Sequence, residues 1–307
     1  MSLVERALKK LQDAKSVEQA GEARPPSAGA PKVIPPTRET AAGSEPRPER
    51  TMTPVESTHV ISVDRAALLA MELLPPAGME RQIASQYQQI KRPLVASVLN
   101  NRAALGPASH VIMLASALPG EGKTFTSINL ALSLALEKDI EVLLVDADVA
   151  KPHVSRICGV EQDRGLTDLL VDSSLRASQC ILRTNTQGLS VLPAGRRVDA
   201  ATELLASERM AEVVAQLAAP DGRRIVLFDS PPLLLSTESR ALVASAGQVV
   251  LVVRAEVTGR MAVMEAIEAI GPNKPVSMIL NQSSTPAPGG YYGYGTYGST
   301  SAPQRAP

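Results

Sequence analysis

The chain has 307 residues, 44% of them hydrophobic, and its 31 basic residues balance its 31 acidic residues. This length and composition allow one sizeable folded domain with appended segments, and the charge balance gives no indication of a nucleic-acid partner. Apolar runs stay below the roughly 20 residues that a membrane-spanning helix needs, and the N-terminus lacks the apolar core of a signal peptide. We therefore expect a cytoplasmic protein.

The N-terminal quarter is expected to contain little packed structure. Residues 1–15 are predicted to form a short amphipathic helix, because apolar side chains recur at helical spacing from Leu3 to Leu11. Residues 16–78 are predicted to be a disordered, proline-rich linker, since such a composition buries too little apolar area to offset chain entropy. A further helix is expected from residue 79 to Lys91, because the residue before Pro93 is biased away from helical conformation.

Beyond residue 108, apolar strands alternate with helix-length segments. Strands buried on both faces are predicted at 110–116, 141–148, 189–195, 224–230, 248–255 and 275–282, and helices at 124–138, 202–219 and 258–270. This alternation predicts an α/β domain over residues 79–282, with a doubly wound, mostly parallel sheet and a ligand site at the carboxyl ends of its strands. Residues 283–307 are rich in Ser, Thr, Pro, Gly and Tyr, and are expected to form a disordered tail.

The stretch "ALPGEGKT", residues 117–124, follows a predicted strand and opens a predicted helix. It has the pattern of a Walker A loop, which predicts a P-loop NTPase fold. Gly120 and Gly122 let backbone N–H groups converge on phosphate oxygens, Lys123 adds a full positive charge, and Thr124 can bind Mg²⁺. An ordinary strand-to-helix turn does not require this Gly-Lys-Thr sequence. The predicted nucleotide-binding residues of the loop are Gly120, Glu121, Gly122, Lys123, Thr124 and Phe125.

Two apolar strands end in aspartates, which a nucleoside triphosphatase needs to organise its metal ion. Asp146 and Asp148 lie two residues apart in "VLLVDAD" and therefore on the same face of a strand. Asp229 ends "IVLFD" and is predicted to be a Walker B aspartate that reaches the metal through water. The structural alternative is that these side chains only cap the helices that follow.

"ALPGEGKT", "VLLVDADVAKP" and "VLFDSPP", in that order and followed by a tyrosine cluster, resemble the bacterial tyrosine kinases (BY-kinases) of polysaccharide export. More narrowly, "MSLVERALKKL", "YQQIKRPL" and the "GGYYGYG" tail resemble the exosortase-associated tyrosine autokinases encoded with exopolysaccharide genes. The strong part of the resemblance covers residues 80–282. It implies a tyrosine kinase that uses ATP and Mg²⁺.

The resemblance also implies a role for each matching residue. Lys123 would bind the β- and γ-phosphates, and Thr124 with Asp229 would organise Mg²⁺. Asp146 and Asp148 would form the additional Walker motif of the family, with Asp146 contacting the metal shell and accepting the phenolic proton. The implied catalytic residues are thus Lys123, Asp146 and Asp148, and the implied metal residues are Thr124, Asp146 and Asp229. Arg254 and Asn281, at the ends of late strands, are candidates for the nucleotide base pocket, although structural roles fit them equally well.

The sequence departs from the family pattern at three places. Ala150 stands where the family often has an arginine, two positions beyond the second aspartate, and Lys151 follows it. The helix that carries Glu-x-x-Arg-x-x-Arg for subunit contacts in relatives has Ser85, Gln88 and Lys91 instead, which calls ring formation through those charges into question. Ala117 replaces the first glycine of the phosphate loop, a change that the family tolerates.

Four of the five tyrosines, Tyr291, Tyr292, Tyr294 and Tyr297, lie in the glycine-rich C-terminal segment. Behind a kinase-like nucleotide site, these phenols are predicted to be the phosphoacceptors, modified in trans by a neighbouring copy. The resemblance implies a homo-oligomer, a separate membrane polysaccharide co-polymerase as activator, and a tyrosine phosphatase as antagonist. It also implies recruitment to the inner face of the cell membrane and a role in exopolysaccharide synthesis or export.

Two other functions remain open at this point. A positioning or partitioning ATPase of the same P-loop branch would hydrolyse ATP as a switch without a tyrosine substrate. Such proteins typically carry a lysine just before the glycine pair of the loop, where this chain has Leu118. A regulatory partner that binds ATP without turning it over is the third possibility, and the intact Lys123, Asp146 and Asp229 argue against it.

Overall fold

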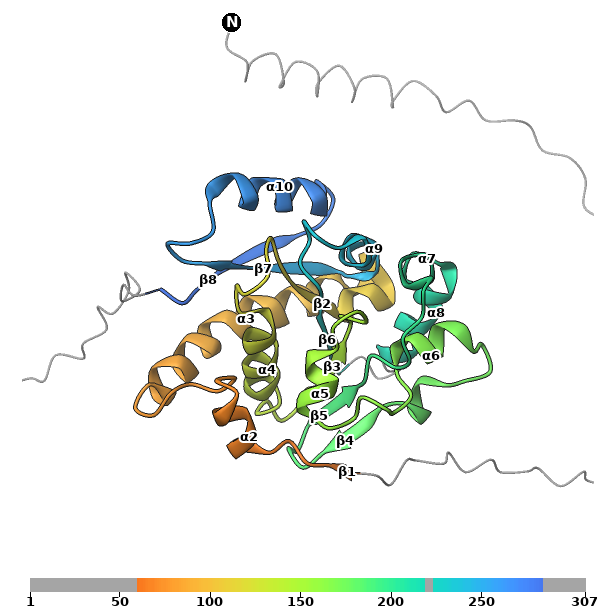
Figure 1. The fold of residues 1–307 in the computed structure, drawn as a ribbon, viewed down its shortest axis with the longest axis horizontal. Helices are drawn as coiled ribbons and strands as arrows, with labels where there is room; N and C mark the ends of the chain where they lie inside the picture. Colours follow the sequence, from red (N-terminus) through yellow and green to blue (C-terminus); the bar gives the residue numbers. More distant parts are fainter. Residues whose placement is uncertain (1–59, 219–222, 284–307) are drawn as a thin grey trace, which may run out of the picture. The chain divides into compact units, whose positions relative to one another are not determined.

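The computed structural model describes residues 60–218 and 223–283, all within one compact unit (Figure 1). In these residues eight strands form one sheet in the order β1-β4-β5-β3-β6-β2-β7-β8. The β4–β5 pair is antiparallel and the other pairs are parallel, which confirms the predicted mostly parallel sheet. The strands are β1 Val60–Ile61, β2 Val111–Ser116, β3 Glu141–Asp146, β4 Leu182–Thr184, β5 Leu189–Leu192, β6 Arg224–Asp229, β7 Gln248–Arg254 and β8 Val276–Asn281.

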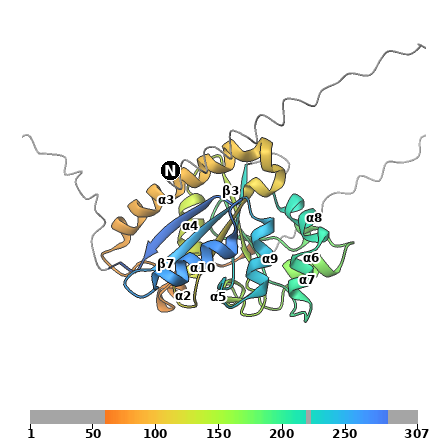
Figure 2. The ribbon, with the colours of Figure 1, turned by 90° about the horizontal axis from the view of Figure 1, so that it is seen from above.

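Helices cover both faces of the sheet, as the doubly wound pattern predicts. One apolar cluster joins the sheet to α6, α8, α9 and α10, and a second joins its other face to α2, α3, α4 and α5. Figure 2 shows α3 running along one side of the molecule. The helices are α2 Arg65–Ala70, α3 Glu80–Leu105, α4 Lys123–Leu134, α5 His153–Ile157, α6 Leu166–Val171, α7 Ala201–Leu205, α8 Glu208–Leu217, α9 Thr237–Ser245 and α10 Arg260–Ile270, with 3₁₀ turns η1 Gly106–His110 and η2 Ala177–Gln179.

The strand order brings the predicted functional segments to one edge of the sheet. β3, β6 and β2 are neighbours, and Asp146 at the end of β3 is the register partner of Asp229 at the end of β6. The loop that follows β2 leads into α4 at this same edge. The ligand site therefore lies at the carboxyl ends of the central strands, where a doubly wound sheet reverses its order.

The prediction that residues 16–78 form a disordered linker is wrong for residues 60–78. This segment contains β1 and α2, and the side chains of Ile61, Leu68 and Leu74 are buried. Asp64 caps α2 by accepting a hydrogen bond from the backbone N–H of Ala66. The proline-rich composition that suggested a linker ends at Pro54, and Ile61, Leu68 and Leu74 belong to the apolar cluster on one face of the sheet. The predicted helix 1–15 and tail 283–307 lie outside the described residues, apart from Ser283.

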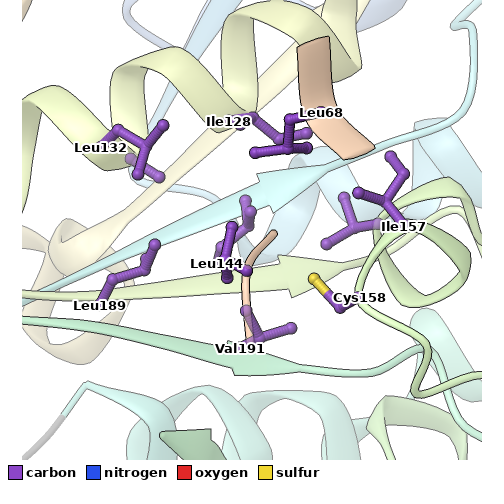
Figure 3. A pocket seen from close by; sticks show the side chains of 11 residues that line it. Leu68, Ile128, Leu132, Leu144, Ile157, Cys158, Leu189 and Val191 are labelled. Atoms are coloured by element: carbon purple, nitrogen blue, oxygen red, sulfur yellow. The ribbon is translucent and has the colours of Figure 1, made fainter. Parts of the chain in front are cut away.

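A small apolar cavity lies beneath this segment, between α2, α4, α5 and the strands β3 and β5 (Figure 3). Leu68, Leu144 and Val191 are among its lining residues. Cys158 contributes its thiol to the lining, and burial raises the pKa of this thiol to about 11. Because the lining offers no charged group, this cavity does not suit a phosphate-bearing ligand, and the nucleotide site has to be sought at the strand ends.

The predicted end of a helix at Lys91 is also wrong, since α3 continues through Pro93 to Leu105. Leu94 and Val98, one helical turn apart, are both buried in the core, so tertiary packing overrides the local effect of proline. Lys91 is buried as well, and its Nζ donates to the carbonyl of Ser133 and pairs with Glu137 at 2.6 Å. The cation that stands in the family's subunit-contact motif is thus engaged within its own chain.

Replacing Pro93 with alanine is expected to raise the free energy of unfolding by about 1–3 kcal/mol. Proline removes one backbone hydrogen bond from the helix interior, and this cost exceeds the entropy that it removes from the unfolded chain. The side chain of Pro93 is exposed, so the change leaves no cavity. Chemical denaturation measures the difference, with the neighbouring exposed Arg92→Ala as the control that should stay within about 0.5 kcal/mol. A loss of stability in Pro93→Ala would contradict this account of α3.

Two further predictions about elements are corrected. The helix expected at 202–219 is two helices, α7 and α8, and Ser207 stands between them in extended conformation as the N-cap of α8. The strand predicted at 275–282 is present as β8, but it is not buried on both faces. Met278 and Leu280 are 61% and 64% exposed, because β8 is the last strand of the sheet.

Candidate active site

The phosphate loop joins β2 to α4 and has the backbone conformation that its glycines allow. Gly122 is the N-cap of α4 with φ 91°, a region that side chains other than glycine rarely adopt. A Cβ atom at this position would lie 2.0 Å from Nδ2 of Asn281. Gly120 also has a positive φ of 77°. The loop therefore presents its backbone, followed by the N-terminus of a 12-residue helix, which is a favourable environment for phosphate.

Lys123, the first residue of α4, is held beside the loop by a local hydrogen bond. Its Nζ donates to Oγ of Ser116 at 2.9 Å, and Ser116 in turn donates to the carbonyl of Leu118. Burial lowers the pKa of Lys123, while nearby carboxylates, Asp229 first, oppose this shift. The site thus holds a partly desolvated cation in place, whose interaction with a phosphate is stronger than it would be in water.

Asp229 organises the first turn of α4. Its Oδ2 accepts a hydrogen bond from Thr124 at 2.8 Å, and its Oδ1 accepts one from Ser127 at 2.9 Å. Burial raises the pKa of Asp229, and the two hydroxyl donors oppose that shift. A carboxylate next to a threonine hydroxyl at the end of a phosphate loop is the donor set expected for a Mg²⁺ ion bound with a nucleotide.

The two carboxylate oxygens of Asp146 differ, because one accepts hydrogen bonds and the other has no partner among the described residues. Its Oδ2 accepts hydrogen bonds from the backbone N–H and the hydroxyl of Ser155, both at 2.7 Å. Its Oδ1 is buried without a hydrogen-bond partner in the described part of the chain. Burial raises the pKa of Asp146 to about 7, against the effect of the Ser155 bonds. An unpartnered buried carboxylate oxygen is costly, so this atom fits a place for a metal-bound water or an incoming proton.

Asp148 completes the carboxylate group of the site. Its Oδ1 accepts a hydrogen bond from the backbone N–H of Lys151, and its side chain is close enough to Lys123 to interact with that charge. Burial raises the pKa of Asp148 as well. Three carboxylates and one lysine share this desolvated region, and, beyond burial, the charges of Asp229 and Asp148 add to the raised pKa of Asp146. A cation that arrives with a nucleotide would relieve this repulsion.

The other predicted nucleotide-binding residues have different surroundings. The carboxylate of Glu121 accepts hydrogen bonds from the backbone N–H of Leu118 and from Thr258, so it fastens the phosphate loop to the segment before α10. Asn281 donates from Nδ2 to the backbone carbonyl of Glu121 at 2.9 Å. Arg254 is exposed and is the register partner of Asn281, which places the two side by side at the rim of the loop. The ring of Phe125 packs against the core on the α3 side.

Four positioning residues were missed by the sequence analysis: Ser116, Ser127, Ser155 and Thr258. Ser127 lies three residues after Thr124 on the same helix face, so helical spacing gives a signal for it. The other three act on residues from which they are separated in sequence, and no local pattern indicates their partners. Ser155 also receives a hydrogen bond from the backbone N–H of Ala194, which links Asp146 to the segment after β5.

Replacing Ser155 with alanine is expected to lower both stability and phosphoryl transfer. The change removes the hydroxyl bond to Asp146 and leaves the buried N–H of Ala194 unpaired, which costs about 1–3 kcal/mol. Asp146 then has more freedom to turn, and transfer should slow by about tenfold. Denaturation and a phosphorylation time course measure the two effects, and Ser174→Ala, at an exposed site, is the control. Unchanged transfer in a destabilised variant would show that Ser155 serves the fold alone.

In residues 60–218 and 223–283, no three His, Cys, Asp or Glu side chains are grouped as a preformed metal site. No helix in the same residues has the length and apolar character to cross a membrane. The predicted phosphoacceptors, Tyr291, Tyr292, Tyr294 and Tyr297, lie outside them.

Comparison with known proteins places these features in a family. The family model described as "AAA domain" matches residues 109–275. Tyrosine-protein kinase YwqD of Bacillus subtilis is 34% identical over 186 residues, which cover 59% of this chain and 77% of that relative. Tyrosine-protein kinase Wzc of Salmonella typhimurium is 31% identical, and the match covers 62% of this chain but 26% of that longer protein.

Solved structures agree with the sequence relatives. The VpsO kinase domain superposes with a TM-score of 0.51 at 32% identity, over 64% of this chain and 98% of that domain. The kinase domain of the Escherichia coli tyrosine kinase ETK gives the same TM-score at 26% identity, over 64% of this chain and 76% of that one. The matched family domain, the identity to YwqD and the convergence of the three motifs at one sheet edge together show that this chain belongs to the bacterial protein-tyrosine kinases.

Proposed function

We propose that the chain is an ATP- and Mg²⁺-dependent autokinase that phosphorylates the C-terminal tyrosines of a neighbouring copy. The observation that carries this proposal is the convergence of Lys123, the Thr124–Asp229 pair and the unpartnered oxygen of Asp146 at the carboxyl ends of β2, β6 and β3. A cation, a metal-binding hydroxyl–carboxylate pair and a carboxylate with a raised pKa are the three elements that phosphoryl transfer to a phenol requires.

Each residue has a task that follows from its surroundings. Lys123 and the N-terminus of α4 would bind and neutralise phosphate oxygens, while Thr124 and Asp229 would hold the metal ion. ATP bound there would supply the γ-phosphoryl group: the phenol oxygen forms the new bond to phosphorus, and ADP leaves as the bond between the β- and γ-phosphates breaks. A phenol has a pKa of about 10 and attacks poorly unless its proton is taken up. Asp146 accepts that proton, for which its raised pKa suits it, and Ser155 fixes its orientation.

The same proposal extends to the cellular role. A cytoplasmic autokinase, recruited to the inner membrane face by a membrane polysaccharide co-polymerase and reset by a tyrosine phosphatase, would regulate exopolysaccharide synthesis or export. The motif resemblance described above supports this role. The internal pairing of Lys91 with Glu137 indicates that subunit contacts in a homo-oligomer would use other residues than that cation.

A mixing experiment tests the activity and its direction. One partner carries Lys123→Met and keeps its tyrosines, and the other keeps Lys123 but has all four tail tyrosines replaced with phenylalanine. After incubation with Mg·ATP, phosphate is expected on the tail of the Lys123→Met partner when the two are mixed, and on neither alone. Mass spectrometry of tail peptides locates it. ATP hydrolysis without tyrosine modification in the wild type would instead support a nucleotide-hydrolysing switch.

A further inference from the structure

Among residues 60–218 and 223–283, nothing pairs with the outer side of β8, the last strand of the sheet. Natural edge strands are usually short, charged or covered, because an open edge pairs readily with other strands. The opposite edge strand, β1, has two residues, whereas β8 has six and contains no charged residue. Met278 and Leu280 on β8 are 61% and 64% exposed. Figure 1 shows α10, the helix that precedes β8 in the chain, and its Met261 and Met264 are 80% and 52% exposed. We call Met278 and Leu280, with the open backbone of β8, the β8 edge.

The backbone of the β8 edge has hydrogen-bonding groups to offer. The carbonyl groups of Pro275 and Asn281 accept bonds from β7, so odd-numbered residues of β8 face β7. By alternation, the N–H and C=O groups of Val276, Met278 and Leu280 point to the open side. A segment that binds here gains backbone pairing and two apolar side chains at the same time.

We propose that the β8 edge binds residues 291–298 of the same chain, "YYGYGTYG", as an added antiparallel strand while the tyrosines are unphosphorylated. The described structure ends at Ser283, directly after β8, and Gln282 has a positive φ of 57°, a conformation typical of turns. The segment 283–290 then holds Pro286 and Pro288, which suit a loop and not a strand. Residues 291–298 contain neither proline nor charge, and eight extended residues span roughly 27 Å, enough for the roughly 20 Å of β8.

The side chains of the tail match the β8 edge in spacing and chemistry. Tyr292 and Tyr294 are two residues apart and share a strand face, as Met278 and Leu280 do. Aromatic rings pack favourably on methionine sulfur and on leucine. Gly293 and Gly295, which lie on the other face of the added strand, have no side chains, so that face has little steric bulk beside the two tyrosines.

This inference rests on the proposed function and adds a binding site for the unphosphorylated tail, which is the substrate in that proposal. Phenols that are packed on the β8 edge are withheld from a neighbouring active site. A phosphate brings about −1.5 to −2 charges, which an apolar, uncharged strand does not accommodate. Phosphorylation thus keeps the tail off the β8 edge and exposes that edge.

Hydrogen exchange at the amides of Val276, Met278 and Leu280 tests the inference in the full chain. Lys123→Met serves as the background, so that no phosphorylation occurs and the result does not depend on kinase activity. These amides are expected to exchange about tenfold or more slower than in the same chain carrying Tyr292→Ser and Tyr294→Ser. The matched control carries Tyr291→Ser and Tyr297→Ser, which removes two phenols from the other face and should keep the protection.

Three results would overturn the inference. The β8 amides could exchange rapidly in the Lys123→Met chain, or both tail variants could retain the protection from exchange. The third is protection that rises with protein concentration and does not change with the tail substitutions. The last result would assign the β8 edge to a second copy. If the wild type does not phosphorylate its tail but the protection is present and needs Tyr292 and Tyr294, the proposed function fails and the docking stands.

Discussion

Replacing Lys123 with methionine is expected to reduce tyrosine phosphorylation by about 100- to 1,000-fold while the protein folds normally. In the proposed mechanism the ammonium group held beside Ser116 neutralises charge on the transferred phosphate, and loss of one such preorganised donor typically costs that factor. Burial lowers the pKa of Lys123, which means that burying its charged form costs folding free energy. A neutral side chain of similar length should therefore not destabilise the fold. Intact-mass measurements over time and a thermal melt give the two readouts.

Lys138→Met is the matched control for this prediction. Lys138 is exposed in the turn after α4, at the opposite end of that helix from the phosphate loop. The same loss of charge there should leave phosphorylation and melting unchanged. Equal tyrosine phosphorylation in Lys123→Met and the wild type would place the active site elsewhere. A much lower melting temperature of the variant would indicate a structural role for the lysine.

The central part of this site could be predicted from sequence because its residues sit in short motifs at the ends of apolar strands. The motif around Lys123 fixes a turn by its glycines, and "VLLVDAD" and "IVLFD" place Asp146 and Asp229 at strand ends. Parallel strands end at one edge of the sheet, so the sequence places the three motifs on that edge. That they meet depends on the strand order, which makes β3, β6 and β2 neighbours. The structure brings the aspartates into direct register.

The parts that could not be predicted depend on contacts between distant segments. The proline rule expects a helix end near Lys91, but burial of Leu94 and Val98 outweighs one missing hydrogen bond. Ser155 is nine residues from Asp146, and only the packing of α5 against β3 brings it within 2.7 Å. The exposure of β8 follows from its position at the end of the sheet, which its apolar sequence does not reveal.

The Asp146→Asn variant is expected to lose phosphoryl transfer by about 100- to 10,000-fold, the usual contribution of a positioned proton acceptor. Asparagine keeps the shape of the side chain, and its amide oxygen can still accept the bonds from Ser155. It cannot take up the phenolic proton or contribute charge to a metal shell. Tail phosphorylation with Mg·ATP measures the loss. Asp163→Asn, which replaces an exposed carboxylate, is the control and should retain full activity.

The same substitution is expected to stabilise the nucleotide-free protein, in a way that depends on pH. The carboxyl group has a pKa of 3.8 in an unfolded chain and about 7 in the folded protein, so the folded state binds the proton more tightly. The wild type therefore loses stability as pH rises from about 4 to 7, by at most roughly 4 kcal/mol, and the loss is constant above pH 7. Asparagine does not ionise, so the gain in stability of the variant over the wild type should be absent near pH 4 and largest from pH 7 upward.

Thermal melts of both proteins between pH 4 and 8 measure this difference in stability. Added Mg·ATP should reverse the difference at pH 8, because the metal ion interacts more favourably with the charged carboxylate of the wild type than with the neutral amide of the variant. A variant that is equally active, or less stable than the wild type at pH 8 without nucleotide, would show that the unpartnered oxygen of Asp146 is neither the proton acceptor nor a buried charge waiting for a cation.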